Sequence, residues 1–417
     1  MFRGQLLVLL VLAAMLLPGC GPAPPSFECT DAIGCVEIAP GDPIKIGALQ
    51  ALSGALASQG LEHLQSTELA VDARGGELLG HPIQLQSEDS LCSGEGGTTA
   101  TLKITADPQT VGIIGPTCSG AAASAMKLAS EAGLVMISGS STAPSLTRLG
   151  GEPGPDWRPG FFRTAQNDAL VGRAAASFAF EILGLTTAAS IHDGDPYTRG
   201  LTDTFRQAFN ELGGQVVLDA AVNKGDTDMR PVLNAVAASG AELLFFPVFR
   251  PEGDYIVLQA TEVEGLENVT LMSAEGLYFD AFIEDVGEAG LGMYFNAPIP
   301  PEGPAYDAFI SRYETKYDQP PTGTPYTAHV YDAASVLLNA IEKVAVQDED
   351  GTLHIGRQAL RDTLYATSGY EGLSGSLTCD EYGDCGAVRI QVTRLDDPAA
   401  GLEGMATNAV YTYPPDQ

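Results

Sequence analysis

Basic residues are scarce in this chain of 417 residues. Lys and Arg together number 21 against 53 Asp and Glu, which gives a formal net charge of −32 at pH 7. Binding to nucleic acid phosphates requires clustered Lys and Arg side chains, so nucleic acid is excluded as a partner. Acidity of this size favours solubility and carries little information about the fold.

Histidine is also rare, and the seven cysteines include no C-x-x-C pair. The five histidines are scattered along the chain at His63, His81, His192, His329 and His354. Structural zinc sites combine such residues at short, regular spacings. The zinc alternative is therefore weak, and we expect neither a metal nor another cofactor.

Sequence motifs of common enzymes are missing. The chain contains no G-x-S-x-G nucleophile elbow, no H-E-x-x-H, no P-loop and no clean G-x-G-x-x-G. His192-Asp193 stands at the end of an expected strand, where the fold explains it. We therefore expect a protein that is not an enzyme, and a secreted hydrolase is the weakest of the functional hypotheses.

The first residues read as a targeting segment. Arg3 supplies a positive charge, and residues 6–17 are twelve apolar residues in a row, too few to span a bilayer but typical of a signal peptide, placed here at residues 1–19. Leu17-Pro18-Gly19-Cys20 resembles a bacterial lipobox, which makes Cys20 the expected lipid-bearing residue. Residues 20–42 are then expected to form a tether. A conventional signal peptide with an incidental cysteine is the alternative.

Six cysteines remain when Cys20 is set aside, and they lie in neighbouring pairs. An even number fits an exported protein with disulfides. Six cysteines allow fifteen connectivities, and local pairing is the interpretation we adopt: Cys29–Cys35, Cys92–Cys118 and Cys379–Cys385.

Hydroxyl-rich segments follow two apolar strands in the first third of the chain. Residues 111–114 read as a buried strand ended by Gly115-Pro116, and Ser119 stands where a helix can begin. The second strand, 134–137, leads into Ser138-Gly139-Ser140-Ser141-Thr142. Backbone N–H groups at a helix start and nearby hydroxyls suit a carboxylate. Ordinary strand-to-helix turns are an equally good interpretation of the spacing alone.

Apolar strands alternate with helical segments from residue 43 onward, which predicts an α/β fold with parallel sheets covered by helices on both faces. Ligands of such sheets bind beyond the carboxyl ends of the strands. A second series of strands and helices begins after 161–164. We divide the chain into residues 43–164 (first lobe, first part), 165–297 (second lobe), 298–386 (first lobe, second part) and 387–417 (C-terminal strands returning toward the second lobe).

The order of several short motifs resembles the type I periplasmic binding proteins, specifically the branched-chain amino acid receptors of ABC importers. The motifs are Ile44-Lys45-Ile46-Gly47, Leu52-Ser53-Gly54, Ala70-Val71-Asp72 with Gly75-Gly76, Glu88-Asp89, Ile114-Gly115-Pro116, Met136-Ile137-Ser138, residues 142–147, Phe162-Arg163-Thr164 and His192-Asp193 through Tyr197. The resemblance implies two Rossmann-like lobes joined by a three-stranded hinge. A bridge matching Cys92–Cys118 occurs in members of that family.

The resemblance also implies a ligand set. Ser119 and Thr142, with the backbone near Ser140, would hold an amino acid's carboxylate, and the neighbouring Ser141 belongs to the same candidate group. Tyr197 and Glu275 would approach from the second lobe, with Glu275 pairing with the α-ammonium. Neutral donors suffice for a carboxylate in a dry cleft, whereas an ammonium there requires an acceptor charge.

Two positions depart from the family pattern and bear on the side-chain pocket. Gln59 stands where relatives often have an aromatic residue, and Phe249 stands where a tyrosine is common, directly before Arg250. Arg250 could meet a polar ligand side chain or face solvent. The expected ligand is an amino acid or a similar small carboxylate or amide, without a commitment to leucine.

These expectations define a receptor rather than a catalyst. A monomer anchored by lipid on the periplasmic or cell-surface side would close on its ligand by hinge motion and deliver it to an ABC permease in the inner membrane. The alternative is a ligand-sensing module that reports to a signalling partner. The sequence contains no fused signalling domain that would favour the second hypothesis.

Overall fold

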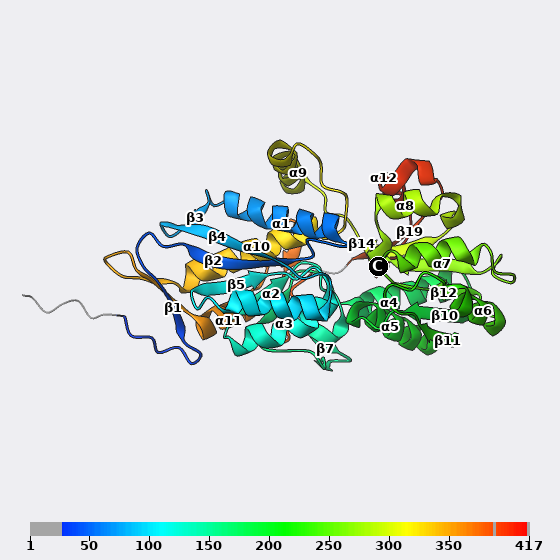
Figure 1. Cartoon of the computed structure of the whole chain (residues 1–417), viewed down its shortest axis with the longest axis horizontal. Helices are drawn as coiled ribbons and strands as arrows, with labels where there is room; N and C mark the ends of the chain where they lie inside the picture. Colours follow the sequence, from blue (N-terminus) through cyan, green and yellow to red (C-terminus); the bar gives the residue numbers. More distant parts are fainter. Residues whose placement is uncertain (1–26, 387–388, 415–417) are drawn as a thin grey trace, which may run out of the picture.

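The computed structural model describes residues 27–386 and 389–414. The expected signal peptide and Cys20 lie outside these residues. Two lobes lie side by side along the longest axis of the molecule (Figure 1). Within the described residues, no helix is both long and apolar enough to cross a membrane.

A six-stranded sheet forms the centre of the first lobe. Its order is β3 (Glu77–Leu78), β4 (His81–Asp89), β2 (Ile44–Gln50), β5 (Thr110–Ile114), β6 (Val135–Ser138) and β9 (Phe161–Arg163). All neighbours are parallel except β3 and β4. Every residue of β5 and β6 is buried, because helices cover both faces and leave no face for polar side chains.

Alternate residues of the central strands serve different helix layers. Ile113 and Met136 pack with α2 (Gly94–Thr105) and α3 (Ser119–Glu131). Ile114 and Ile137 pack on the other face, with α10 (Thr327–Val344) and α11 (Arg357–Tyr365). The helix α1 (Ala57–Asp72) lies beside α10 on that second face (Figure 1). Successive side chains of a strand point to opposite faces of the sheet, so each central strand packs against both helix layers.

The second lobe is built on a seven-stranded mixed sheet. Its order is β11 (Gln215–Ala221), β10 (Thr187–His192), β12 (Leu243–Phe245), β13 (Thr270–Ala274), β14 (Tyr294–Pro298), β19 (Ile390–Arg394) and β20 (Ala409–Tyr413). The last two strands run antiparallel to their neighbours. The α/β fold with two lobes is confirmed, and the sheets are mixed rather than purely parallel.

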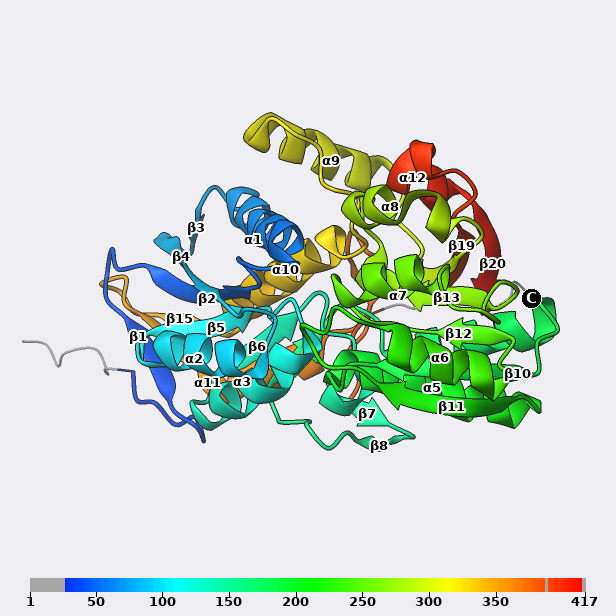
Figure 2. The same ribbon diagram turned by 45° about the vertical axis from the view of Figure 1, so that its right-hand side comes forward.

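Helices also cover both faces of the second sheet. One core joins the sheet to α4 (Asp168–Ser177) and α5 (Pro196–Leu212). The opposite core contains α6 (Arg230–Ser239), α7 (Glu252–Ala260), α8 (Asp280–Val286) and α12 (Gly401–Thr407). The helix α9 (Pro304–Tyr317) does not pack on either central sheet and lies next to α1 of the first lobe (Figure 2).

The predicted tether, residues 20–42, extends too far, because its C-terminal part contains a strand of the first lobe. Residues of β1 (Cys35–Ile38) pair antiparallel with β16 (Leu353–Gly356), which in turn pairs with β15 (Val346–Gln347). Val36 and Ile38 are buried in the core of the first lobe. Their alternation with polar neighbours is the pattern of a half-buried strand, and this pattern was overlooked in the short segment before residue 43.

All three predicted disulfides are confirmed: Cys29–Cys35, Cys92–Cys118 and Cys379–Cys385. The second joins the loop before α2 to the residue before α3. It therefore ties together two loops at the carboxyl edge of the first sheet, where the two lobes face each other.

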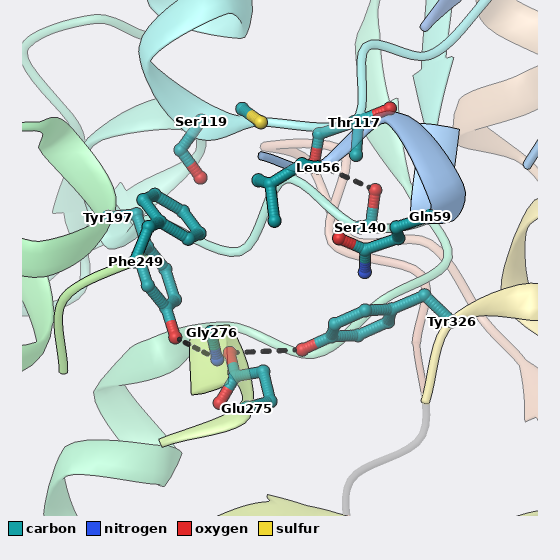
Figure 3. A pocket seen from close by; sticks show the side chains of 11 residues that line it. Leu56, Gln59, Thr117, Ser119, Ser140, Tyr197, Phe249, Glu275, Gly276 and Tyr326 are labelled. Atoms are coloured by element: carbon teal, nitrogen blue, oxygen red, sulfur yellow. Dashed lines mark hydrogen bonds between the residues drawn. The ribbon is translucent and has the colours of Figure 1, made fainter. Parts of the chain in front are cut away.

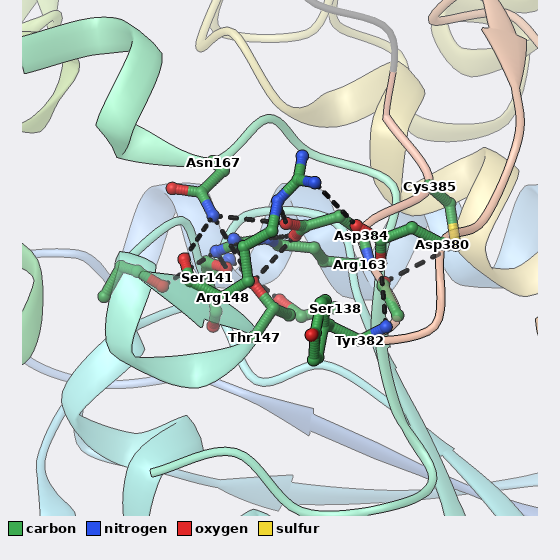
Figure 4. Close-up of polar contacts among 12 residues, drawn as sticks. Ser138, Ser141, Thr147, Arg148, Arg163, Asn167, Asp380, Tyr382, Asp384 and Cys385 are labelled. Atoms are coloured by element: carbon green, nitrogen blue, oxygen red, sulfur yellow. Dashed lines mark hydrogen bonds and ion pairs between the residues drawn. The ribbon is translucent and has the colours of Figure 1, made fainter. Parts of the chain in front are cut away.

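The chain crosses between the lobes three times: after β9, after β14 and before β19. Arg163, at the first crossing, is fully buried and its Nε lies 2.5 Å from Oδ1 of Asp384, at the third (Figure 4). Arg163 also donates to the carbonyls of Ser141 and Ala143 at 3.2 and 2.9 Å. Its guanidinium therefore fixes the base of the hinge to the first lobe.

Candidate functional site

A narrow cavity lies between the lobes, at the carboxyl ends of the parallel strands. Figure 3 shows its side chains converging from both sides. The lining residues are Leu56, Gln59, Thr117, Cys118, Ser119, Ser140 and Tyr326 from the first lobe, and Tyr197, Phe249, Glu275 and Gly276 from the second. Six of the eight residues expected to bind ligand are therefore brought together: Gln59, Ser119, Ser140, Tyr197, Phe249 and Glu275.

Hydroxyl groups line the wall from the first lobe. Ser119 is the first residue of α3, and its Oγ accepts a hydrogen bond of 3.1 Å from the backbone N–H of Ala143. Ser140 donates from Oγ to the carbonyl of Thr117 at 2.9 Å, and Thr117 donates to Oε1 of Gln50 at 2.8 Å. The positive end of α3 and these dipoles suit a negatively charged ligand group.

Ser141 and Thr142 do not line the cavity, in contrast to the sequence prediction. Ser141 is fully buried and donates from Oγ to the carbonyl of Pro116 at 2.9 Å. The carbonyl of Thr142 accepts a 3.0 Å hydrogen bond from the backbone N–H of Asp168. The chain turns inward after Ser140, so these two residues connect the ends of neighbouring elements.

Two aromatic rings and one carboxyl group form the wall from the second lobe. Tyr197 and Phe249 stack with ring centroids 4.9 Å apart. The phenolic oxygen of Tyr197 accepts a 3.0 Å hydrogen bond from the backbone N–H of Gly276. Tyr197 lies in the first turn of α5, whose N-cap Asp195 accepts from the Tyr197 N–H at 3.0 Å. The cap therefore sets the position of the ring.

Glu275 is the charged group of the cavity. It is 5 % exposed, and its Oε1 accepts a 3.1 Å hydrogen bond from the hydroxyl of Tyr326, across the gap between the lobes (Figure 3). Its Oε2 has no hydrogen-bond partner within residues 27–386 and 389–414. Burial raises the pKa of Glu275 to about 7. A buried carboxylate with an unused oxygen is stabilised by a cation that brings N–H donors.

A second buried carboxyl group interacts electrostatically with Glu275. Asp168, the first residue of α4, is fully buried, and both of its carboxyl oxygens lack a hydrogen-bond partner in the described part of the chain. Burial and the charge of Glu275 raise its pKa well above the usual value. Asp168 does not line the cavity, and it affects the site through its electrostatic interaction with Glu275.

Six residues of this region were absent from the predicted ligand set: Leu56, Thr117, Cys118, Gly276, Tyr326 and Asp168. Asp168 follows Asn167 directly before an expected helix, so a helix-start pattern was available there. Thr117 stands two residues before Ser119, in the segment already singled out. Tyr326 lies in an irregular loop between α9 and α10, and no strand-end pattern marks it.

Arg250 lies in a second, outer cavity of the cleft rather than beside Glu275. That cavity shares Leu56 and Phe249 with the inner one. The guanidinium of Arg250 pairs with Asp254 at 2.8 Å and also with Asp285. Its charge is therefore balanced by residues of its own lobe.

No group of three or more potential metal ligands occurs among the residues that the structure describes. His63 and His329 are buried near the cavity, and burial lowers their pKa values to about 3 and about 4. Both imidazoles are therefore neutral at pH 7.

Comparison with known proteins gives one consistent result. Residues 43–396 match the family model described as periplasmic binding protein. An amino acid binding protein of Pseudomonas aeruginosa is 27 % identical over 314 residues, 73 % of this chain and 80 % of that protein. The Leu/Ile/Val-binding protein homolog 3 of Brucella melitensis is 27 % identical over 364 residues, 86 % of this chain and 94 % of its own length.

Solved structures agree in fold. A leucine binding protein from Thermotoga maritima has a TM-score of 0.74 at 25 % identity, covering 85 % of this chain and 96 % of its own. A solute binding protein from R. palustris in complex with benzoate has a TM-score of 0.70 at 21 % identity, covering 85 % and 93 %. The relatives are binding proteins, in line with the expectation that this chain is not an enzyme.

Proposed function

This chain belongs to the periplasmic binding protein family, and from that premise we propose that it is an extracytoplasmic receptor for an amino acid or a similar small carboxylate or amide. The two lobes enclose the ligand, and the closed form delivers it to an ABC permease. The function requires no catalytic step.

The observation that carries this proposal is the unused oxygen of Glu275, opposite a wall of hydroxyls. An α-ammonium group between Glu275 and the hydroxyls of Tyr197 and Tyr326 supplies the donors that this carboxylate lacks. The ligand's carboxylate then lies toward Ser119 and the start of α3. Opposite charges at the two ends match a zwitterion of amino acid size.

The ligand's side chain is assigned to the space between Leu56, Gln59 and Phe249. Phe249 supplies an apolar ring without a hydroxyl, and Gln59 supplies an amide at 7 % exposure. An apolar pocket with one amide accepts a medium-sized side chain and discriminates only modestly by size. One relative, from Pseudomonas aeruginosa, is named for leucine, isoleucine, valine, threonine and alanine binding, and its name supports this ligand class.

Location and partners complete the proposal. Cys20 carries a lipid that holds the receptor on the outer side of the inner membrane or on the cell surface, and the chain between Cys20 and β1 links the lipid to the first lobe. The receptor works as a monomer. Mass spectrometry of the membrane-extracted protein tests the anchor: a mature N-terminus other than a lipid-modified Cys20 contradicts it.

The function is tested by a thermal-shift screen of protein that begins after Cys20, against amino acids, their amides and small carboxylates. A ligand at 100 times its Kd adds about 2.7 kcal/mol of stability. We expect Glu275→Gln to abolish the shift caused by α-amino ligands, because the amide brings no negative charge. The control Glu211→Gln, on the exposed face of α5, retains it. Normal binding by Glu275→Gln contradicts the assignment of the ammonium site.

A further inference from the structure

Glu62 is a buried acid outside the cavity that gathers donors from a distant segment. It lies in α1 and is 1 % exposed. Its Oε2 accepts a 2.8 Å hydrogen bond from the backbone N–H of Thr322 and another from that residue's hydroxyl. Its Oε1 accepts from the hydroxyls of Thr324, at 3.2 Å, and Thr327. Four donors on one carboxylate satisfy the charge without a cation.

Two of the threonines that bond to Glu62 flank one residue of the candidate site in the sequence. Tyr326 lies between Thr324 and Thr327, and its side chain is the only one of this loop segment that lines the inner cavity among the described residues. Its hydroxyl donates to Glu275 at 3.1 Å and accepts from Nε2 of Gln166 at 2.7 Å. Glu62 therefore bonds to residues on both sides of Tyr326, through the backbone and hydroxyl of Thr322 and the hydroxyls of Thr324 and Thr327, while the Tyr326 hydroxyl reaches the second lobe.

The same face of α1 holds the segment that precedes this loop. Tyr313 donates from its hydroxyl to Gln65, and Tyr317 donates to Oε2 of Glu68 at 2.7 Å. Lys316 pairs with Asp72 at 2.6 Å. Positions 62, 65, 68 and 72 follow the three-to-four-residue spacing of one helix face. The loop between α9 and α10 is thus fixed to α1 at both of its ends, and Glu62 holds the end next to the cavity.

We propose that Glu62 is a positioning residue of the ligand site, which acts by holding Tyr326 in reach of Glu275. The role in ligand binding rests on the proposed function, whereas the effect on Tyr326 and Glu275 is a property of the empty protein. Glu62 itself does not line the cavity, so its influence on Glu275 passes through the threonine loop.

The test measures Glu275 without any ligand. Carbon-13-labelled glutamate gives a carboxyl signal for Glu275, assigned by its loss in Glu275→Gln, and this signal is followed by NMR through a pH titration. The Tyr326 hydroxyl lowers the pKa of Glu275 against the raising effect of burial. Asp168, Tyr197 and Tyr326 are the titratable groups coupled to this site, and all three remain in Glu62 variants.

We expect Glu62→Ala to move the titration of Glu275 to higher pH by the same amount as Tyr326→Phe. The double variant Glu62→Ala/Tyr326→Phe then shows no further shift, because both changes remove the same hydrogen bond. Glu62→Gln preserves most of the normal titration, since the amide can bond to the same threonines. The control Glu211→Gln, at an exposed position of α5, leaves the titration unchanged.

An unchanged Glu275 titration in folded Glu62→Ala overturns the proposal, and so does an additive double variant. If Glu62→Ala does not fold, Thr327→Val provides the second variant: it removes one donor at nearly constant side-chain volume. A shift of the Glu275 titration in the same direction supports the proposal, and no shift overturns it. Failure to find any ligand would contradict the proposed function and leave these results standing.

Discussion

Gly120, at the start of α3 in the first lobe, faces the carboxylate of Asp195, at the start of α5 in the second. A Cβ atom on Gly120 would overlap Oδ2 of Asp195. The same carboxylate caps α5 and pairs with Lys224 at 2.8 Å. Two helix N-termini that would repel each other are therefore brought close by one shared anion, and only glycine leaves the space.

A side chain at position 120 is expected to hold the lobes apart. We predict that Gly120→Val weakens ligand binding by roughly tenfold or more, about 1.4 kcal/mol, since the closed state becomes strained. Small-angle X-ray scattering of this variant with ligand should give a larger radius of gyration than that of the unaltered protein. Equal affinity and equal radius would show that the contact does not limit closure.

The buried pair Arg163–Asp384 is expected to be the most sensitive point of the hinge. The Arg163 guanidinium holds the pKa of Asp384 below its usual value in spite of burial. Removing one partner of a buried pair leaves an uncompensated charge, which costs about 3–5 kcal/mol. We predict a loss of that size for Arg163→Ala in urea unfolding followed by circular dichroism.

The exposed pair Arg173–Glu211 is the control for that experiment. Exposed ion pairs contribute about 0–1 kcal/mol, so Arg173→Ala should unfold almost as the unaltered protein does. Similar losses of unfolding free energy in both variants would mean that burial does not increase the contribution of the Arg163–Asp384 pair to stability.

The raised pKa of Glu275 makes stability and binding depend on pH in opposite directions. The folded value of about 7 exceeds the ordinary value of 4.5, so the folded protein binds the extra proton and the empty protein loses stability as the pH rises between these values. An α-ammonium ligand needs the ionised carboxylate, so its affinity should rise with pH up to about 7. Isothermal titration calorimetry in several buffers detects the released proton, and Glu275→Gln should remove the pH dependence of any residual binding.

The disulfides are expected to differ in their contribution to the free energy of unfolding, because the loops that they close differ in length. Cys92 and Cys118 are 26 residues apart, and Cys29 and Cys35 are six apart. The chain-entropy relation gives about 3.5 kcal/mol for the longer loop and about 2.2 kcal/mol for the shorter. Paired Cys→Ala variants, compared by thermal unfolding, should show the larger loss for the longer loop. The reverse order would indicate that native-state contacts, and not loop entropy, dominate.

The fold could be predicted from the sequence because its strands are short apolar segments that alternate with helical segments along the chain. Residues 111–114 and 134–137 needed no further information. The β1 strand was missed, since a four-residue edge strand becomes recognisable only beside its partner β16, more than three hundred residues later. Short strands carry too few side chains for a pattern to stand out.

The candidate site was predictable where it follows strand ends and was missed where it depends on long-range contacts. Ser119, Tyr197 and Glu275 all come directly after strands or at helix starts. Tyr326 lines the cavity from a loop that is hydrogen-bonded to Glu62, and no local sequence pattern records that contact. Ser141 and Thr142 share the composition of Ser140 but turn away from the cavity, a difference of backbone direction that composition does not encode.

The small sheet of β1, β16 and β15 has a consequence for biogenesis. The first strand among the described residues pairs with a strand that is synthesised near residue 355, and the hinge pair needs Asp384. During synthesis β1 therefore has no partner strand until residues 353–356 are made, whereas the strands of the six-stranded sheet are all present once Arg163 has been made. The central sheet of the first lobe can therefore form early, while its N-terminal strand and the buried hinge pair wait for residues from the last quarter of the chain.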